Sequence, residues 1–129
     1  MPGYVYNAQV LDKAFVLTQQ SIAQTLSVTL VFVETDEMFV LNNQLRNKPT
    51  PTDVISLPFE QGVGEIYICP EFIKQQGHDL DRITHLWVHG LLHIAGFTHD
   101  TDETFKVMSD HEIHILAQLN IQDPYYESH

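Results

Sequence analysis

Three histidines near the end of the chain have the spacing of a metal site. They lie in the segment His89-Gly-Leu-Leu-His93-Ile-Ala-Gly96-Phe-Thr-His99. On a helix, residues four positions apart lie on one face, so His89 and His93 can direct both imidazoles at one ion. Gly96 can adopt the left-handed conformation that ends a helix, and His99 then returns as a third ligand. Three protein ligands with one open position are typical of a catalytic zinc, whereas structural sites have four.

Two other interpretations of this segment must be weighed. The three residues could be ordinary histidines on and after a helix. Their spacing also matches the H-E-x-x-H-x-x-G-x-x-H pattern of the metzincin proteases, but Gly90 stands where those enzymes carry glutamate. That glutamate is the general base that activates water for peptide hydrolysis. Its absence disfavours a protease.

The same segment resembles the signature of a known family. HGLLHIAGFTH is similar to H-G-x-L-H-x-x-G-[YF]-D-H, the pattern of the YbeY family, the bacterial rRNA-maturation endoribonucleases. Leu41-Asn42 with Arg46, followed by PTDVIS at residues 51–56, resembles the L-N-x-x-[YF]-R and P-T-D-V-L-S-F blocks of that family. GEIYI at residues 64–68 resembles its G-D-I-x-I strand. These blocks have the family's order and spacing, and the resemblance covers about residues 28–116.

The resemblance implies a zinc-dependent, single-strand-specific endoribonuclease that acts in rRNA maturation and ribosome quality control. It implies one zinc ion per chain on His89, His93 and His99, with Arg46 as a catalytic residue in the metal cleft. The implied partners are RNA, as an rRNA precursor, and the ribosome or its small-subunit proteins, but neither DNA nor a membrane. Thr98 stands where the family has aspartate. A carboxylate there could orient a ligand, so this difference bears on how tightly the metal is held.

Cleavage of a phosphodiester needs an activated nucleophile and stabilisation of negative charge on phosphorus. A tri-histidine zinc can lower the pKa of its water to ~7, or it can bind a phosphate oxygen and leave the attack to the RNA 2′-hydroxyl. The sequence does not distinguish these routes. Arg46 offers a planar charged fork for phosphate oxygens, or else forms a surface salt bridge. Lys48 attracts phosphate or is a solvated loop lysine, and His85, one turn before His89, supports the site or simply packs.

Other polar and sulfur-containing residues near these motifs are expected to be structural. Asp53 and Ser56 are expected to stabilise the loop and the entry to a strand, with direct contact with substrate as the alternative. Met108 is expected to pack in the core, with a floor beneath the metal as the alternative. His111 and His114 are expected on the solvated face of the last helix.

The elements that must position these residues follow from hydrophobic periodicity and from glycine and proline punctuation. Helices are predicted over about residues 7–26, 35–45, 70–76, 80–95 and 100–119. Strands are predicted over residues 26–33, 53–59 and 65–69. The predicted fold class is therefore α+β. We expect a single hydrolase domain over residues 1–129, in which helices flank a small mixed β-sheet and a helix with the loop after it forms the metal cleft.

Some local details are also predicted. Thr35 and Asp36 are expected to cap the second helix. Its apolar residues Phe39, Val40 and Leu45 are expected to face inward. Residues 100–103 resemble a capping box for the last helix, through Asp100 and Glu103. The C-terminal segment QDPYYESH is expected to be frayed.

The composition is that of a folded globular protein with an acidic balance. Of 129 residues, 43% are hydrophobic and 18% are charged, and the formal net charge is −11. No stretch approaches the ~18–20 apolar residues that cross a bilayer, and the N-terminal residues lack the pattern of a secretory signal. The lone Cys69 cannot form an intramolecular disulfide. A cytoplasmic protein is therefore expected.

The negative charge limits how the chain can bind RNA. Because the whole-molecule field repels phosphates, binding must come from a local patch, a bound metal or a partner. Two functions compete with the endoribonuclease. One is a zinc hydrolase of another class, such as a peptidase or amidase. The other is a ribosome-associated factor with little intrinsic nuclease activity, which an acidic surface suits because ribosomal proteins are basic.

Overall fold

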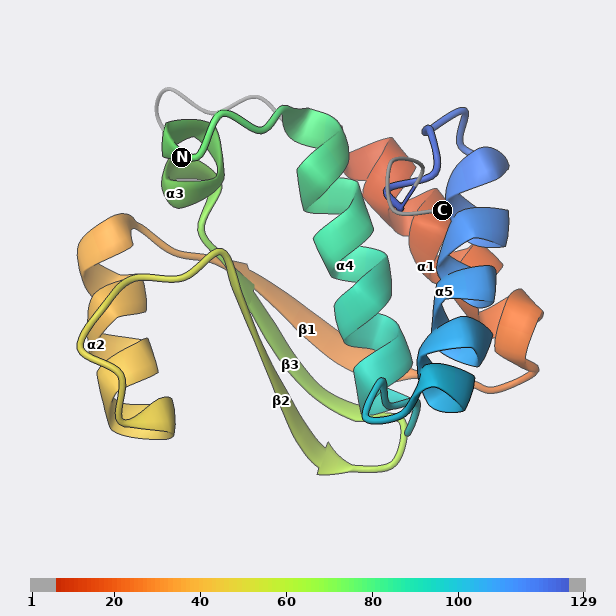
Figure 1. Cartoon of the computed structure of the whole chain (residues 1–129), viewed down its shortest axis with the longest axis horizontal. Helices are drawn as coiled ribbons and strands as arrows, with labels where there is room; N and C mark the ends of the chain where they lie inside the picture. Colours follow the sequence, from red (N-terminus) through yellow and green to blue (C-terminus); the bar gives the residue numbers. More distant parts are fainter. Residues whose placement is uncertain (1–6, 126–129) are drawn as a thin grey trace.

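Eight helices and strands follow one another in the computed structural model, which describes residues 7–125 (Figure 1). In chain order they are α1 (Ala8–Ile22), β1 (Ser27–Phe32), α2 (Thr35–Arg46), β2 (Val54–Glu60), β3 (Val63–Ile68), α3 (Pro70–Gln75), α4 (Leu80–Ile94) and α5 (Asp102–Ala117). Every predicted element is present. The largest difference is at the end of α1, which stops before Leu26 because Ala23 adopts a left-handed conformation with φ 54°.

The three strands form a mixed sheet in the order β1-β3-β2. β1 runs parallel to β3, with Ser27 opposite Val63 and Phe32 opposite Ile68. β2 runs antiparallel to β3 and carries an irregularity between Pro58 and Glu60. The predicted α+β class with a small mixed sheet is confirmed.

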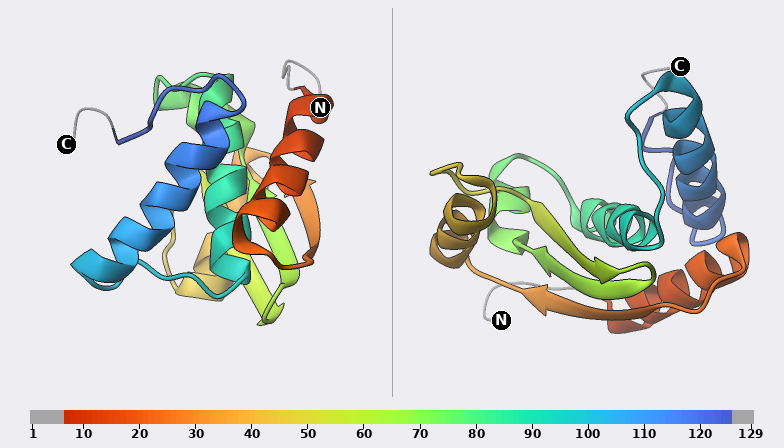
Figure 2. Two further views of the ribbon diagram at one scale, coloured as in Figure 1. Left: turned by 90° about the vertical axis from the view of Figure 1, so that its right-hand side faces the viewer. Right: turned by 90° about the horizontal axis from the view of Figure 1, so that it is seen from below.

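Helix α4 lies against one face of the sheet, with α1 and α5 packed on it (Figure 2). Burial alternates along β3, so that Gly64, Ile66 and Ile68 face inward while the residues between them are half-buried. Ile66 and Ile68 join the apolar residues of α1, α4 and α5 in the larger core cluster. Trp87 of α4 also donates from Nε1 to the carbonyl oxygen of Leu11 at 3.0 Å, which ties α1 to α4. This packing fixes α4, the helix that carries the histidines.

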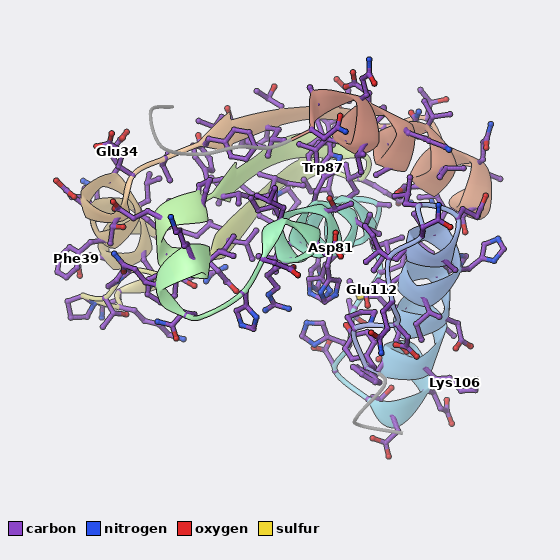
Figure 3. All side chains as sticks on the ribbon, turned by 90° about the horizontal axis from the view of Figure 1, so that it is seen from above. Glu34, Phe39, Asp81, Trp87, Lys106 and Glu112 are labelled. Atoms are coloured by element: carbon purple, nitrogen blue, oxygen red, sulfur yellow. The ribbon has the colours of Figure 1, made fainter. Side chains whose placement is uncertain are left out.

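Helix α2 lies apart from α4 and packs on a smaller core cluster (Figure 1). The expectation that Phe39, Val40 and Leu45 face inward is wrong, since they are 39%, 49% and 46% exposed. Figure 3 shows Phe39 pointing outward. The buried residues of α2 are Met38 and Asn42, because this short helix contacts the core through only a narrow stripe.

The predicted caps of α2 and α5 are also wrong. Glu34 is the N-cap of α2, and Thr35 instead hydrogen-bonds through its hydroxyl to Glu71 of α3. At α5, Thr101 rather than Asp100 is the N-cap, and its hydroxyl accepts from the Thr104 N–H at 3.1 Å. In both cases the N-cap lies one residue away from an expected capping residue, before Thr35 at α2 and after Asp100 at α5.

The C-terminal segment was expected to be frayed, but it is held in place up to Tyr125. Its hydroxyl donates to Glu112 Oε2 at 2.6 Å, which fastens this segment to α5. Residues 126–129, over which fraying was also expected, lie outside the described residues. Between residues 7 and 125, no helix combines the length and apolar character needed to span a membrane.

Candidate metal centre

Helix α4 presents two of the three histidines, and the turn that follows presents the third. Asp79 caps the start of α4 by accepting from the Asp81 N–H at 3.1 Å. At the other end Gly96 adopts φ +108°, a conformation that side chains disfavour, as the sequence predicted. The Phe97 N–H donates to the Leu92 carbonyl at 2.9 Å and closes this turn. The chain therefore reverses, and His99 returns beside His89 and His93.

The three rings lie close enough to hold one ion. Their ligating nitrogens all fall within 4.8 Å of one another. The Nε2 atoms of His89 and His93 are 3.0 Å apart, and the His99 ring centroid lies 5.5 Å from that of His89 and 4.9 Å from that of His93. Nitrogen ligands at about 2.0–2.1 Å from a tetrahedral zinc are about 3.4 Å apart. The cluster could therefore hold one metal ion after small side-chain movements.

Both helical histidines have an acceptor on the nitrogen that faces away from the cluster. His93 Nδ1 lies 3.2 Å from the Phe97 carbonyl oxygen, which can only accept, so Nδ1 carries the proton. His89 Nδ1 is hydrogen-bonded to the Glu112 carboxylate. Each bond leaves the Nε2 lone pair free for a metal. This donor set is suited to a metal ion.

The surroundings also favour the neutral imidazole that binds metals. Burial lowers the pKa of His93, and the neighbouring His89 and His99 lower it further. A metal must displace any proton on the ligating nitrogen. At neutral pH the proton therefore competes weakly with a metal at His93.

Sequence reasoning missed Glu112 and Tyr125. Glu112 of α5 is 0% exposed and lies between α4 and α5 (Figure 3). Burial alone would raise the pKa of Glu112, but the neighbouring His85 ring and the hydrogen bonds from His89 and Tyr125 lower it to about 2. A signal for Glu112 was available in the sequence, because it lies on the same helix face as the buried Met108, Ile115 and Leu116. A carboxylate at such a position calls for a specific partner.

Position 90 has no space for a side chain. A Cβ atom on Gly90 would lie 2.7 Å from Ile66 Cδ1 and 2.8 Å from Ser56 Oγ. Both distances are shorter than real Cβ contacts. A glutamate at this position, as in the metzincin pattern, would therefore require Ile66 and Ser56 to shift.

The three histidines open into a cleft of about 530 Å³. One wall is formed by α4 and the turn after it, and the other by Arg46, Asp53 and Ser56 from the end of α2 through β2. The fold thus brings Arg46 to the same cleft as the histidines. Asp53 also lies 3.2 Å from Arg82, so its charge is paired.

The two candidate supporting residues lie outside the cleft lining. Lys48 is exposed on the loop after α2. His85 is 6% exposed and lies behind His89, with ring centroids 6.1 Å apart. Its Nδ1 accepts from Arg82 Nη1 at 3.1 Å, and its Nε2 lies 3.6 Å from Glu112 Oε1, too far for a hydrogen bond. His85 therefore packs beside His89 and behind the cleft.

The remaining expectations for α5 are met except for one. Met108 is buried in the core and His114 is exposed, as expected. His111 was expected to be solvated, but it is half-buried and its Nδ1 is hydrogen-bonded to Ser21 Oγ at 2.7 Å. The reason is that α1 packs against α5 and brings Ser21 to this position.

Known proteins resemble this chain over most of its length. Residues 7–120 match the family model described as Endoribonuclease YbeY. Proteins named Endoribonuclease YbeY from Francisella tularensis, subspecies tularensis and novicida, are each 40% identical, over 78% of this chain and 72% of their own. The solution structure of TM1509 from Thermotoga maritima aligns with a TM-score of 0.61 and 25% identity, over 92% of this chain and 89% of that protein. The family match includes Arg46 and all three clustered histidines.

Proposed function

The chain belongs to the YbeY family of endoribonucleases, and we propose that it cleaves single-stranded RNA with one zinc ion held by His89, His93 and His99. The observation that carries this proposal is the pair of Nε2 atoms 3.0 Å apart at a cleft, each on a ring whose Nδ1 has an acceptor. Imidazole ligands suit zinc, and three of them leave a position for water or substrate. Zinc bound there supplies Lewis acidity beside the scissile phosphate.

The residues of the chain divide the remaining work. Arg46 is exposed at the cleft and can hold phosphate oxygens through two parallel N–H bonds. Of the residues that line the described cleft, it is the one lysine or arginine. The Phe97 carbonyl oxygen holds the ring of His93 in the orientation that the metal needs.

We further propose that the substrate is an rRNA precursor and that the chain works with the ribosome in the cytoplasm. The net charge of −11 repels long stretches of RNA backbone, so contact is confined to the cleft. An unpaired strand is flexible enough to present one phosphate to Arg46. Basic small-subunit ribosomal proteins are the partners that the acidic surface suits. The buried free Cys69 is compatible with a reducing compartment.

Elemental analysis tests the metal. Protein purified without chelators should contain about one zinc per chain, and His93→Ala should contain none because it removes a ligand. The matched control is His114→Ala, which removes an exposed histidine of α5 and should keep the zinc. A parent protein without metal would overturn the proposed site.

Cleavage assays test the role of Arg46. Arg46→Glu should lose cleavage of a single-stranded RNA oligonucleotide while keeping its zinc. Lys13→Glu, on the exposed surface of α1, makes the same change in net charge and should cleave like the parent. If Arg46→Glu also cleaves like the parent, Arg46 is not catalytic. A zinc-loaded parent that leaves RNA intact would favour the ribosome-associated factor instead.

A further inference from the structure

A hydrogen-bonded chain runs from the C-terminal segment to a metal-binding histidine. The Tyr125 hydroxyl donates to Glu112 Oε2, and Glu112 Oε1 accepts from His89 Nδ1. We propose that Glu112 and Tyr125 are positioning residues for the metal, with Tyr125 fixing the Glu112 carboxylate and Glu112 fixing the His89 ring. The inference rests on the proposed function, because it assumes that the ion binds at His89, His93 and His99.

The burial of Glu112 is the first observation behind this proposal. Its side chain is 1% exposed, and a charged group removed from water is costly unless it is fully paired. Both carboxylate oxygens have a partner. Oε1 is hydrogen-bonded to His89 and lies near His85, and Oε2 accepts from Tyr125. Packing alone would be served better by an apolar residue, as at Met108 and Ile115 on the same face.

The effect on His89 is the second step. An acceptor on Nδ1 keeps the proton there and leaves Nε2 as the ligand atom. A carboxylate acceptor also makes the imidazole a stronger ligand than a neutral acceptor does. The corresponding Nδ1 of His93 is hydrogen-bonded to the Phe97 carbonyl oxygen. Of the two clustered histidines on α4, His89 is therefore the one with a carboxylate partner.

The geometry of Tyr125 is the third step. Its ring packs edge-on against His85 and Phe105, with centroids 5.7 Å and 5.4 Å apart, which restrains the direction of the hydroxyl. Burial and the Glu112 carboxylate raise the pKa of Tyr125, so the hydroxyl keeps its proton and donates. A side chain 36 residues after His89 in the sequence thus reaches the metal centre through one carboxylate.

Zinc affinity, measured by competition with a chromophoric chelator, tests the proposal. Glu112→Gln keeps the size of the side chain but removes its charge, and should weaken zinc binding by about 10–100-fold. Tyr125→Phe removes only a hydroxyl and should weaken binding by roughly tenfold, the lower end of that range. The matched controls are Glu65→Gln and Tyr67→Phe, because Tyr67 donates to Glu65 at 3.1 Å on β3 and neither residue lines the cleft. Both controls should bind zinc like the parent.

Nitrogen NMR of the metal-free protein gives a readout that does not depend on metal. His89 should have its proton on Nδ1 in the parent, and Glu112→Gln should reduce that population. If the parent binds no zinc, the proposed function fails, while the NMR comparison still tests whether Glu112 orients His89.

Thermal denaturation separates positioning from a purely structural role. If Tyr125→Phe and Glu112→Gln melt earlier but bind zinc like the parent, Glu112 and Tyr125 merely fasten the C-terminal segment, and the proposal is overturned. An unchanged His89 tautomer in Glu112→Gln overturns it as well. Tyr125→Phe keeps the aromatic ring, so a folded variant remains available if Glu112→Gln does not fold.

Discussion

Replacing Gly90 with alanine tests how closely α4 lies on the sheet. The new Cβ would be 2.7 Å from Ile66 Cδ1 and 2.8 Å from Ser56 Oγ. Ile66 is 0% exposed, so its end methyl group can move only within the packed core. We therefore expect α4 or the side chains of β2 and β3 to shift.

Two opposing terms determine the size of the effect. In the interior of a helix, alanine is favoured over glycine by roughly 0.5–1 kcal/mol. Overpacking of a well-packed core costs about 1–3 kcal/mol. The free energy of unfolding should therefore fall by about 1 kcal/mol in Gly90→Ala, the difference between the middles of these ranges.

Urea denaturation of metal-free protein measures this change without a contribution from metal binding. Ile66→Val removes the Cδ1 that the new methyl group would meet, and alone costs about 0.5–1.5 kcal/mol. The double variant should lose less stability than the two single variants together, by at least about 0.5 kcal/mol. Ile115→Val, at a buried position on α5, should instead be additive with Gly90→Ala.

A gain in stability would refute this reasoning. At a helix position with free space, Gly90→Ala would make the protein more stable than the parent by up to about 1 kcal/mol. Additivity with Ile66→Val would refute the close contact as well. The shift expected for a glutamate at position 90 would then lose its physical basis.

Three further predictions concern stability. Chelating the metal from zinc-loaded protein should lower the melting temperature, because metal that binds only the folded state stabilises it, and calorimetry showing the same curve would contradict this linkage. Trp87→Phe should cost about 1–3 kcal/mol in urea denaturation, since it removes aromatic volume and the bond to the Leu11 carbonyl; a parent-like midpoint would mean that this contact is weak. Lys106→Ala should change stability by less than about 0.5 kcal/mol, because Lys106 and Asp110 form an exposed pair on α5, and a larger loss would indicate contacts beyond that pair.

The sequence predicted those parts of the site that depend on local geometry. His89 and His93 share a helix face because of their spacing, and Gly96 ends that helix through its own backbone freedom. Arg46 was assigned to the cleft through the family resemblance, since periodicity says nothing about where the end of α2 meets α4. The helix and strand positions followed from apolar periods that each element carries within itself.

The parts that were missed depend on contacts between distant segments. Glu112 meets His89 across 23 residues, and Tyr125 meets Glu112 only because the segment after α5 folds back. The inward face of α2 was wrong for a related reason. Phe39 and Val40 are apolar, but the small core cluster beneath α2 has room for only the stripe that includes Met38.

The placement of carboxylates argues for an anionic substrate over a peptide. In the H-E-x-x-H arrangement, a glutamate on the ligand helix serves as the general base for water. Here residue 90 is a glycine packed against Ile66 and Ser56, and Glu112 instead bonds to the Nδ1 of His89, whereas the Nε2 of that ring faces His93. The carboxylate that lines the cleft, Asp53, is paired with Arg82. The cleft therefore presents Arg46 and three clustered imidazoles while Asp53 is paired with Arg82, an arrangement that suits the proposed phosphodiester substrate better than a peptide.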